Sequence, residues 1–246
     1  MSLRLPLGTN LTSGNVYFSF LLRVDDLGPA FASDGTLAGF TTGTGTSFGT
    51  KINIRTNGSG GYNLGTSKGT GTAYGAWAGA DFNVGDTLLL VGRYFFNGGN
   101  GTDDVCDLWL NPPRGSLGAT SPPPATIPGV GNGGTDLAQI DRFFFRSGGS
   151  SSSPAKLVAD EVRVGVTWAQ VTPPAPPVLA LQKPGTGLTL VWSTNSPVFA
   201  VQSASSLAPS AIWANESSSP TINGTNYTFV VQPTNVARFY RLAPLQ

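Results

Sequence analysis

Apolar and polar residues alternate along much of the chain, a pattern typical of strands with one buried face. The clearest run is 16–24, where Val16, Phe18, Phe20, Leu22 and Val24 fall at every second position. Shorter runs on either side of a glycine-rich stretch predict a hairpin. The remaining strands that we expect in the first part of the chain follow from similar apolar runs. The hairpin strands are 51–55 and 62–64, and the others are 87–96, 105–110, 140–146 and 157–164.

Proline and glycine interrupt this pattern at two places. Residues 111–135 are rich in both and predict an irregular segment. Residues 172–177 contain four prolines and predict a stiff, extended linker. We therefore expect one domain over 1–172, a linker over 173–177 and a small domain over 178–246. The small domain also alternates, at 188–192, 199–203, 227–231 and 238–242, so we expect a second sandwich of strands and no helix longer than two turns.

The composition supports an all-β fold and excludes several classes of partner. Glycine (33) and proline (19) are abundant, and apolar residues make up 39% of the chain, enough for packed cores. The net charge is +1 and no basic stripe occurs, so we expect no nucleic-acid partner. No run of about 18 apolar residues occurs, so we expect no membrane-spanning helix. Residues 1–7 are too short and broken for a signal peptide, and we expect a leader and a first strand upstream of them.

Few residues are suited to catalysis. The chain has no histidine, which excludes Ser-His-Asp and Cys-His chemistry, and its one cysteine, Cys106, lies in an apolar run and is expected to be a buried thiol. Glycoside hydrolysis needs two neighbouring carboxylates, yet the two glutamates, Glu161 and Glu216, fall in different predicted domains. We expect Glu161 to pair with a nearby arginine. The sequence therefore predicts a non-catalytic protein and leaves a hydrolase or lyase as a remote alternative.

Two groups of residues are candidates for binding. Asp103 and Asp104 end the polar turn 100–104 and could supply calcium ligands, although a hairpin turn without metal needs the same residue types. Asp25, Asp26 and Asp34 form a second, similar option. No other cofactor is expected.

The second group is aromatic. Tyr62, Tyr74 and Trp77 lie in glycine- and threonine-rich surroundings and could form a platform on which a sugar stacks. The alternative is that these rings cap the ends of the sandwich.

The run Asp-Glu-Val-Arg-Val-Gly at 160–165, followed by the tryptophan-containing tail 167–171, resembles the closing strand of laminin-G-like and concanavalin A-like jelly-roll domains. The order of the strands before it agrees, so the resemblance covers about residues 1–172. The C-terminal strands resemble a short Ig-like or fibronectin-III-like module of secreted bacterial surface proteins. The resemblance implies an extracellular or cell-surface bacterial protein that binds carbohydrate or acts in adhesion.

Two functions therefore remain open. The first is a binding module whose partner is a polysaccharide or surface glycan. The second is a structural subunit that self-associates into a layer or filament. Charged residues make up only 11% of the chain, against about 25% in a typical soluble domain, so copies repel one another weakly. An unpaired sheet edge would give a neighbouring copy a place to add a strand.

Overall fold

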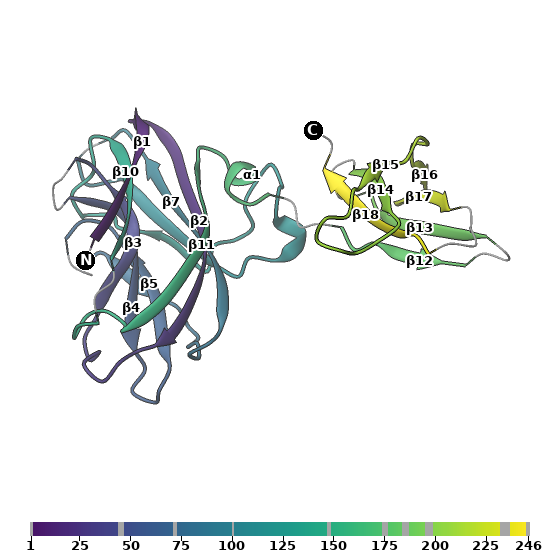
Figure 1. The fold of residues 1–246 in the computed structure, drawn as a ribbon. Helices are drawn as coiled ribbons and strands as arrows, with labels where there is room; N and C mark the ends of the chain where they lie inside the picture. Colours follow the sequence, from purple (N-terminus) through teal and green to yellow (C-terminus); the bar gives the residue numbers. More distant parts are fainter. Residues whose placement is uncertain are drawn as a thin grey trace. The chain divides into compact units, whose positions relative to one another are not determined.

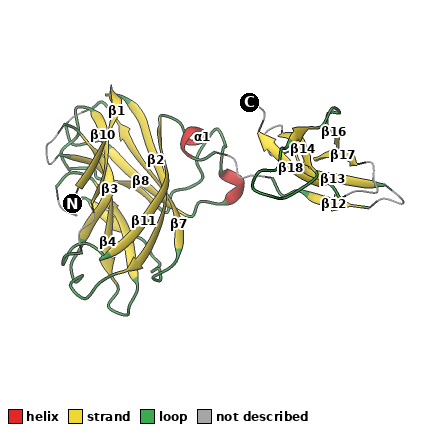
Figure 2. Cartoon of the chain, in the orientation of Figure 1, coloured by secondary structure: helices red, strands yellow, loops and turns green. Residues whose placement is uncertain are grey.

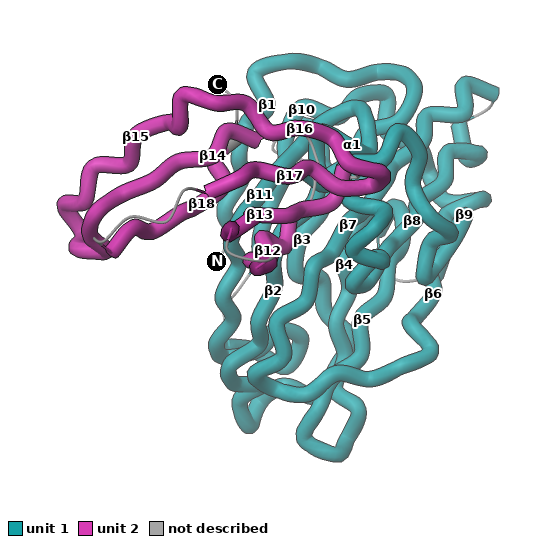
Figure 3. Tube along the Cα trace, turned by 90° about the vertical axis from the view of Figure 1, so that its right-hand side faces the viewer, with its two compact units in different colours: residues 1–173 teal, residues 174–246 magenta. Residues whose placement is uncertain are grey.

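The computed structural model describes residues 2–43, 47–70, 73–99, 101–146, 149–173, 177–183, 187–194, 199–231 and 237–244. Strands dominate it (Figures 1 and 2), which confirms the all-β prediction. Across these residues helical structure is limited to a 3-10 turn, Arg114–Ser116, and one turn of helix, α1 (Trp168–Val171). The chain divides into two compact units, Met1–Pro173 and Pro174–Gln246 (Figure 3). Positions 174–176 of the predicted linker lie outside the described residues.

The first unit contains two antiparallel sheets, here called sheet A and sheet B. Sheet A has six strands in the order β1 (Ser2–Leu11), β10 (Ile140–Arg146), β3 (Gly35–Thr41), β4 (Phe48–Thr56), β5 (Tyr62–Ser67) and β6 (Gly75–Trp77). Sheet B has five strands in the order β11 (Lys156–Gly165), β2 (Gly14–Asp26), β7 (Thr87–Phe96), β8 (Val105–Leu110) and β9 (Ile127–Val130).

The core lies between the two sheets because each strand turns its alternate apolar residues inward. Phe18 of β2 packs against Phe40 of β3 and Phe143 of β10, with ring centroids 5.0 Å apart in both pairs. Ile52 and Ile54 of β4 enter the same core and have no exposed surface. The alternation that predicted 16–24 as a strand thus reflects burial of one face against sheet A.

The outer face of sheet B carries a smaller core of its own. Tyr17, Val91 and Trp109 point outward from the sheet and are covered by Trp168 and Val171 of α1. A capping box at Thr167 starts this helix, and Ser19 Oγ donates a hydrogen bond to the Val171 carbonyl at 2.5 Å. The tail that follows the closing strand therefore covers this face of sheet B.

The N-terminal segment differs from the sequence-based expectation. Residues 2–11, for which no strand was predicted, form β1, an edge strand that pairs with β10 in the register Leu3↔Phe145 and Leu5↔Phe143. Leu3 and Leu5 face the core side, yet they stay 54% and 36% exposed because β1 is the last strand of sheet A. Leu3, Leu5 and Leu7 alternate in the sequence, so the pattern of this strand was present but was missed.

The second unit also consists of two antiparallel sheets. One contains β12 (Ala180–Gln182), β13 (Leu188–Ser193), β17 (Asn226–Val231) and β16 (Thr221–Asn223), and the other contains β15 (Ala214–Asn215), β14 (Phe199–Ala204) and β18 (Phe239–Pro244). Its buried core is small, and Trp192 stacks on Tyr227 at 5.6 Å inside it.

Candidate functional site

Positive charge is concentrated on sheet A. Its six strands contain five cations and one carboxylate, Asp141, whereas the five strands of sheet B contain four cations and five carboxylates. The cations of sheet A are Arg4, Lys51, Arg55, Arg142 and Arg146. The chain as a whole is nearly neutral, so this is a segregation of charge between the two faces of the first unit.

The strand register places these cations on the outer face of sheet A. Arg4 lies opposite Phe144, Phe144 opposite Gly39, Gly39 opposite Lys51, and Lys51 opposite Ser67. Paired residues of neighbouring strands point to the same side of a sheet. Because Phe143 and Ile52, one position along, point into the core, this row points away from it.

The middle of this face is polar and buried. Asn53 is 2% exposed, donates to Ser67 Oγ at 2.8 Å and accepts a hydrogen bond from the Thr36 hydroxyl at 3.2 Å. Lys51 is also 2% exposed, and burial lowers the pKa of its amine from 10.5 to about 8 because the charged form loses water. The arginines lie around these buried polar residues. Arg4, Arg55 and Arg142 are half-buried and Arg146 is exposed.

Trp77 and Arg55 form a fixed pair at the β6 side of the face. The Arg55 guanidinium carbon lies 4.4 Å from the centre of the Trp77 ring, within the range of a cation–π contact. Gly65, opposite Trp77 in the ladder, leaves room for the indole, since a Cβ there would lie 2.8 Å from a ring atom. The Trp77 ring therefore fixes the orientation of the Arg55 guanidinium at the surface of this face.

The three predicted aromatic residues do not form one platform. Tyr62 has no exposed surface and packs in the core, where burial raises the pKa of its hydroxyl to about 12. It alternates with Leu64, so its ring points inward and cannot stack on a sugar. Tyr74 is 45% exposed and lies against Gly133 and Gly134. Trp77 packs on Gly65 instead. The prediction that Tyr62 belongs to an exposed sugar site is therefore wrong, because its ring is buried in the core.

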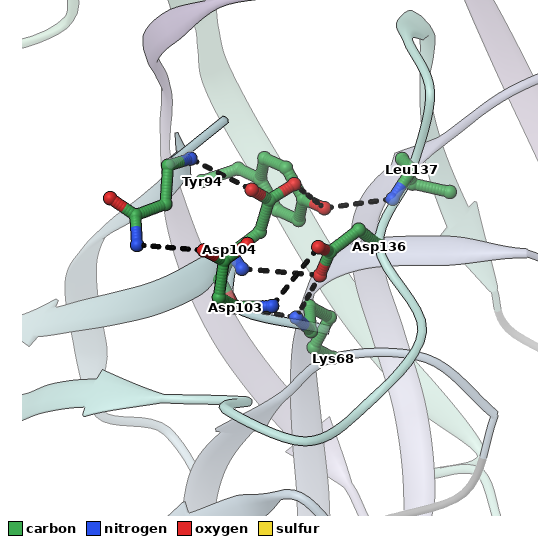
Figure 4. A network of polar contacts seen from close by, with 7 residues as sticks. Lys68, Tyr94, Asp103, Asp104, Asp136 and Leu137 are labelled. Atoms are coloured by element: carbon green, nitrogen blue, oxygen red, sulfur yellow. Dashed lines mark hydrogen bonds and ion pairs between the residues drawn. The ribbon is translucent and has the colours of Figure 1, made fainter. Parts of the chain in front are cut away.

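The predicted calcium ligands, Asp103 and Asp104, lie in a partly buried polar cluster with Asp136 (Figure 4). One carboxylate oxygen from each residue lies within 4.8 Å of the others. Asp104 accepts from the Tyr94 hydroxyl at 2.7 Å and from the backbone N–H of Asn97 at 2.8 Å. Burial, followed by the Asp104 hydrogen bond, raises the pKa of the Tyr94 hydroxyl, which therefore stays a donor. Position 100 of the predicted turn lies outside the described residues.

Lys68 supplies positive charge inside this cluster. Its side chain is fully buried, and its Nζ forms an ion pair with Asp136 and donates to the Asp104 carbonyl at 2.5 Å. Asp136 also accepts the backbone N–H groups of Asp103 and Asp104, at 3.1 and 3.2 Å. The Lys68 ammonium and backbone N–H groups thus bind the same carboxylate oxygens that a calcium ion would need as ligands. Calcium binding at this cluster stays a prediction.

Sequence reasoning did not find Arg55, Lys68 or Asp136. Arg55 could have been found, since it alternates with Ile52 and Ile54 and must point away from the core. Lys68 and Asp136 are 68 positions apart, and only the fold brings them together. The expected partner of Glu161 is Arg163, with which it forms an ion pair. Cys106 is buried, as expected.

No protein-family model matches the chain, and no curated protein sequence matches it. Among solved structures, a heptameric SAP-like pentraxin from Limulus polyphemus aligns with 14% identity and a TM-score of 0.40, covering 70% of this chain and 73% of the pentraxin. An alginate lyase aligns with 14% identity and a TM-score of 0.43, covering 66% and 72%. The binding domain of botulinum neurotoxin serotype D aligns with 10% identity and a TM-score of 0.40, covering 98% and 67%.

At these identities and scores the likenesses carry no conclusion about ligand or activity, so function is argued from the residues of this chain. Within the described ranges, no helix is both long enough and apolar enough to cross a membrane.

Proposed function

We propose that this protein is a non-catalytic glycan-binding protein, and that its ligand is an acidic polysaccharide lying across the outer face of sheet A. The observation that carries the proposal is the charge of that face, where five cations stand on six strands beside a single carboxylate. Sugar carboxylates and sulfates pair with arginine in the planar, two-point geometry that the guanidinium offers.

The two faces of the first unit are not equivalent as binding surfaces. The outer face of sheet B is covered by α1 around Tyr17, Val91 and Trp109, and its strands carry no excess of positive charge. On sheet A, the half-buried Arg55 and Trp77 offer a positive group held in one orientation, so little side-chain entropy is lost when a ligand binds. Tyr74 offers an exposed ring near the same edge of the sheet.

Binding to immobilised alginate, with neutral dextran of similar length as the comparison, tests the proposal. We expect alginate to bind and dextran not to bind, with affinity that falls as salt is raised because surface charges are screened. Arg55→Ala should weaken binding about tenfold, equivalent to roughly 1.4 kcal/mol. Trp77→Ala should weaken alginate binding less, because this substitution removes the ring that holds Arg55 but keeps the positive charge of Arg55.

Arg23→Ala is the matched control, since Arg23 is an exposed cation of sheet B that pairs with Asp25. It should leave alginate binding unchanged. Equal binding to dextran, or an equal loss in Arg23→Ala and Arg55→Ala, would reject the assignment to sheet A. Absence of binding to alginate and to a sulfated polymer such as heparin would reject the acidic ligand altogether.

One observation favours a second candidate, a polysaccharide lyase. Lys51 lies on the same face, and with a pKa of about 8 its amine is partly neutral near neutral pH and could remove a proton. A lyase acting on alginate leaves an unsaturated sugar at each cut, which absorbs ultraviolet light. An increase in ultraviolet absorbance that is lost in Lys51→Met would establish the lyase activity. If the polymer stays intact, the lyase is rejected and glycan binding remains as the proposed function.

A further inference from the structure

Lys68 is a primary amine with no exposed surface, and its Nζ contacts a carboxylate oxygen of Asp136. Asp136 itself is only 11% exposed. The proposed glycan site uses neither residue, since both lie at the cluster of Figure 4 and not on the outer face of sheet A. The geometry points to an intramolecular isopeptide bond, an amide joining Lys68 Nζ to Asp136 Cγ with loss of one water.

The surroundings prepare the Asp136 carboxyl group for attack. Its two oxygens accept the backbone N–H groups of Asp103 and Asp104 at 3.1 and 3.2 Å. When an amine adds to a carboxyl carbon, negative charge develops on an oxygen of the tetrahedral intermediate. Each oxygen of Asp136 has one backbone N–H fixed beside it, and such a donor stabilises this charge, as backbone N–H groups do in acyl-transfer enzymes.

A neighbouring carboxylate can carry the proton that the reaction must move. Oxygens of Asp103, Asp104 and Asp136 lie within 4.8 Å of one another, and Asp104 is only 4% exposed. A carboxylate oxygen this close to the reacting pair is within reach of the proton that leaves the Lys68 amine. Asp104 is held in place by the Tyr94 hydroxyl and the backbone N–H of Asn97, so its carboxyl group stays beside the reacting pair.

The reaction balances without a further reagent. The Lys68 ammonium gives a proton to the carboxylate cluster and becomes a neutral amine. Its lone pair attacks Asp136 Cγ, forming the C–N bond. The tetrahedral intermediate then collapses, the C–O bond breaks, and the leaving hydroxyl takes a proton and departs as water. One ammonium and one carboxylate become one amide and one water.

Burial gives a reason for the amide to persist. A buried ion pair keeps two charges out of water, and their conversion to a neutral amide removes this desolvation penalty. The bond would also join residues 68 positions apart and so restrict the unfolded chain, as a disulfide does. Cys106 is the one cysteine of the chain, so a disulfide within the chain cannot supply such a restraint.

The mass of the intact, denatured protein tests the inference. The full chain, held folded at neutral pH and then denatured, should weigh less than its sequence by one water. Trypsin should fail to cut after Lys68, and a branched peptide should join residues 56–93 to residues 115–142. A chain with its full sequence mass, cut normally after Lys68, would overturn the inference and leave a buried ion pair.

Two variants separate this bond from other losses of water, such as cyclisation at Asp34-Gly35. Lys68→Arg keeps a positive charge and removes the primary amine, so it should show the full sequence mass. Asp136→Asn should still react and release ammonia in place of water, and its product should have the same mass as the crosslinked natural chain. A loss of water that persists in Lys68→Arg would overturn the assignment.

Discussion

At the residue scale, Lys51 shows how one buried amine links the binding face to stability. Its pKa in the folded chain is about 8, against an ordinary value of 10.5, because burial disfavours the charged form. Between these two pH values the unfolded chain binds more protons than the folded chain. The contribution of Lys51 to stability therefore rises as the pH increases from about 8 to about 10.5.

This sign can be measured with Lys51→Met. We expect the free energy of unfolding of the natural chain, minus that of the variant, to rise through this pH window. Cys106 and Tyr62, whose pKa values burial raises to about 12, lower stability at alkaline pH in both chains and so cancel in the difference. Urea unfolding at several pH values gives the result, and a flat or falling difference would contradict the burial of the charged amine.

Cys106 gives a second prediction at this scale. The thiol is buried in the core and burial raises its pKa to about 12, so almost no thiolate forms near neutral pH. We expect a thiol reagent to modify the folded protein no faster than the protein opens, and to modify it at once in denaturant. Fast modification of the native chain, in the absence of unfolding seen by circular dichroism, would contradict this burial.

At the scale of elements, sequence patterns located strands better than they located surfaces. The alternation at 16–24 and the apolar run at 87–96 predicted β2 and β7 because each packs one or both faces against apolar neighbours. Local patterns missed β1, β3, β6 and β9, and β9 lies within residues 111–135, which were predicted to be irregular. They also placed Tyr62 outside the core, although its spacing from Leu64 indicates an inward ring.

The candidate sites were predicted only in part, for a physical reason. Asp103 and Asp104 are adjacent in the sequence, but Lys68 and Asp136 reach them only through long-range packing. Likewise, the charge of sheet A results from single cations on separate strands, and none forms a basic run in the sequence. Such sites require the order of the strands, which alternation does not provide.

The edge strand β1 carries the prediction for self-association. Leu3 and Leu5 are exposed on its core side, and the edge of sheet A beyond β1 is not paired in the described part of the chain. If copies associate there, Leu3→Glu should weaken association about tenfold, or roughly 1.4 kcal/mol. Because Leu3 is 54% exposed, stability should change by about 0.5 kcal/mol or less.

Sedimentation over a range of concentrations measures this association. Val178→Glu is the control, because Val178 is also an exposed apolar residue, at 74%, and lies in the second unit. A monomer at every concentration would contradict self-association, and an equal effect of both variants would contradict its location at β1.

At the scale of the whole molecule, the two units have separate cores. The first contains the large core between sheets A and B, whereas the second has a buried core of Leu190, Trp192, Val201, Phe229 and Val231. We expect residues 1–173 alone to fold and to unfold at the same temperature as the corresponding transition of the full chain. The smaller core should give a separate transition at lower temperature. Calorimetry of both chains measures this, and one transition that shifts on truncation would contradict independent units.

The cap on sheet B also determines how the first unit would bear load. Val171 and Thr172, the last residues before the proline-rich segment, are 1% and 2% exposed, and Val171 is tied to Ser19 of the inner strand β2. A force applied to the first unit at its C-terminal end therefore acts first on α1, which packs on the middle of sheet B, and only then on the edge strand β11. We therefore expect α1 to resist tension, because Trp168 must leave Tyr17 and Trp109 before β11 can separate from β2.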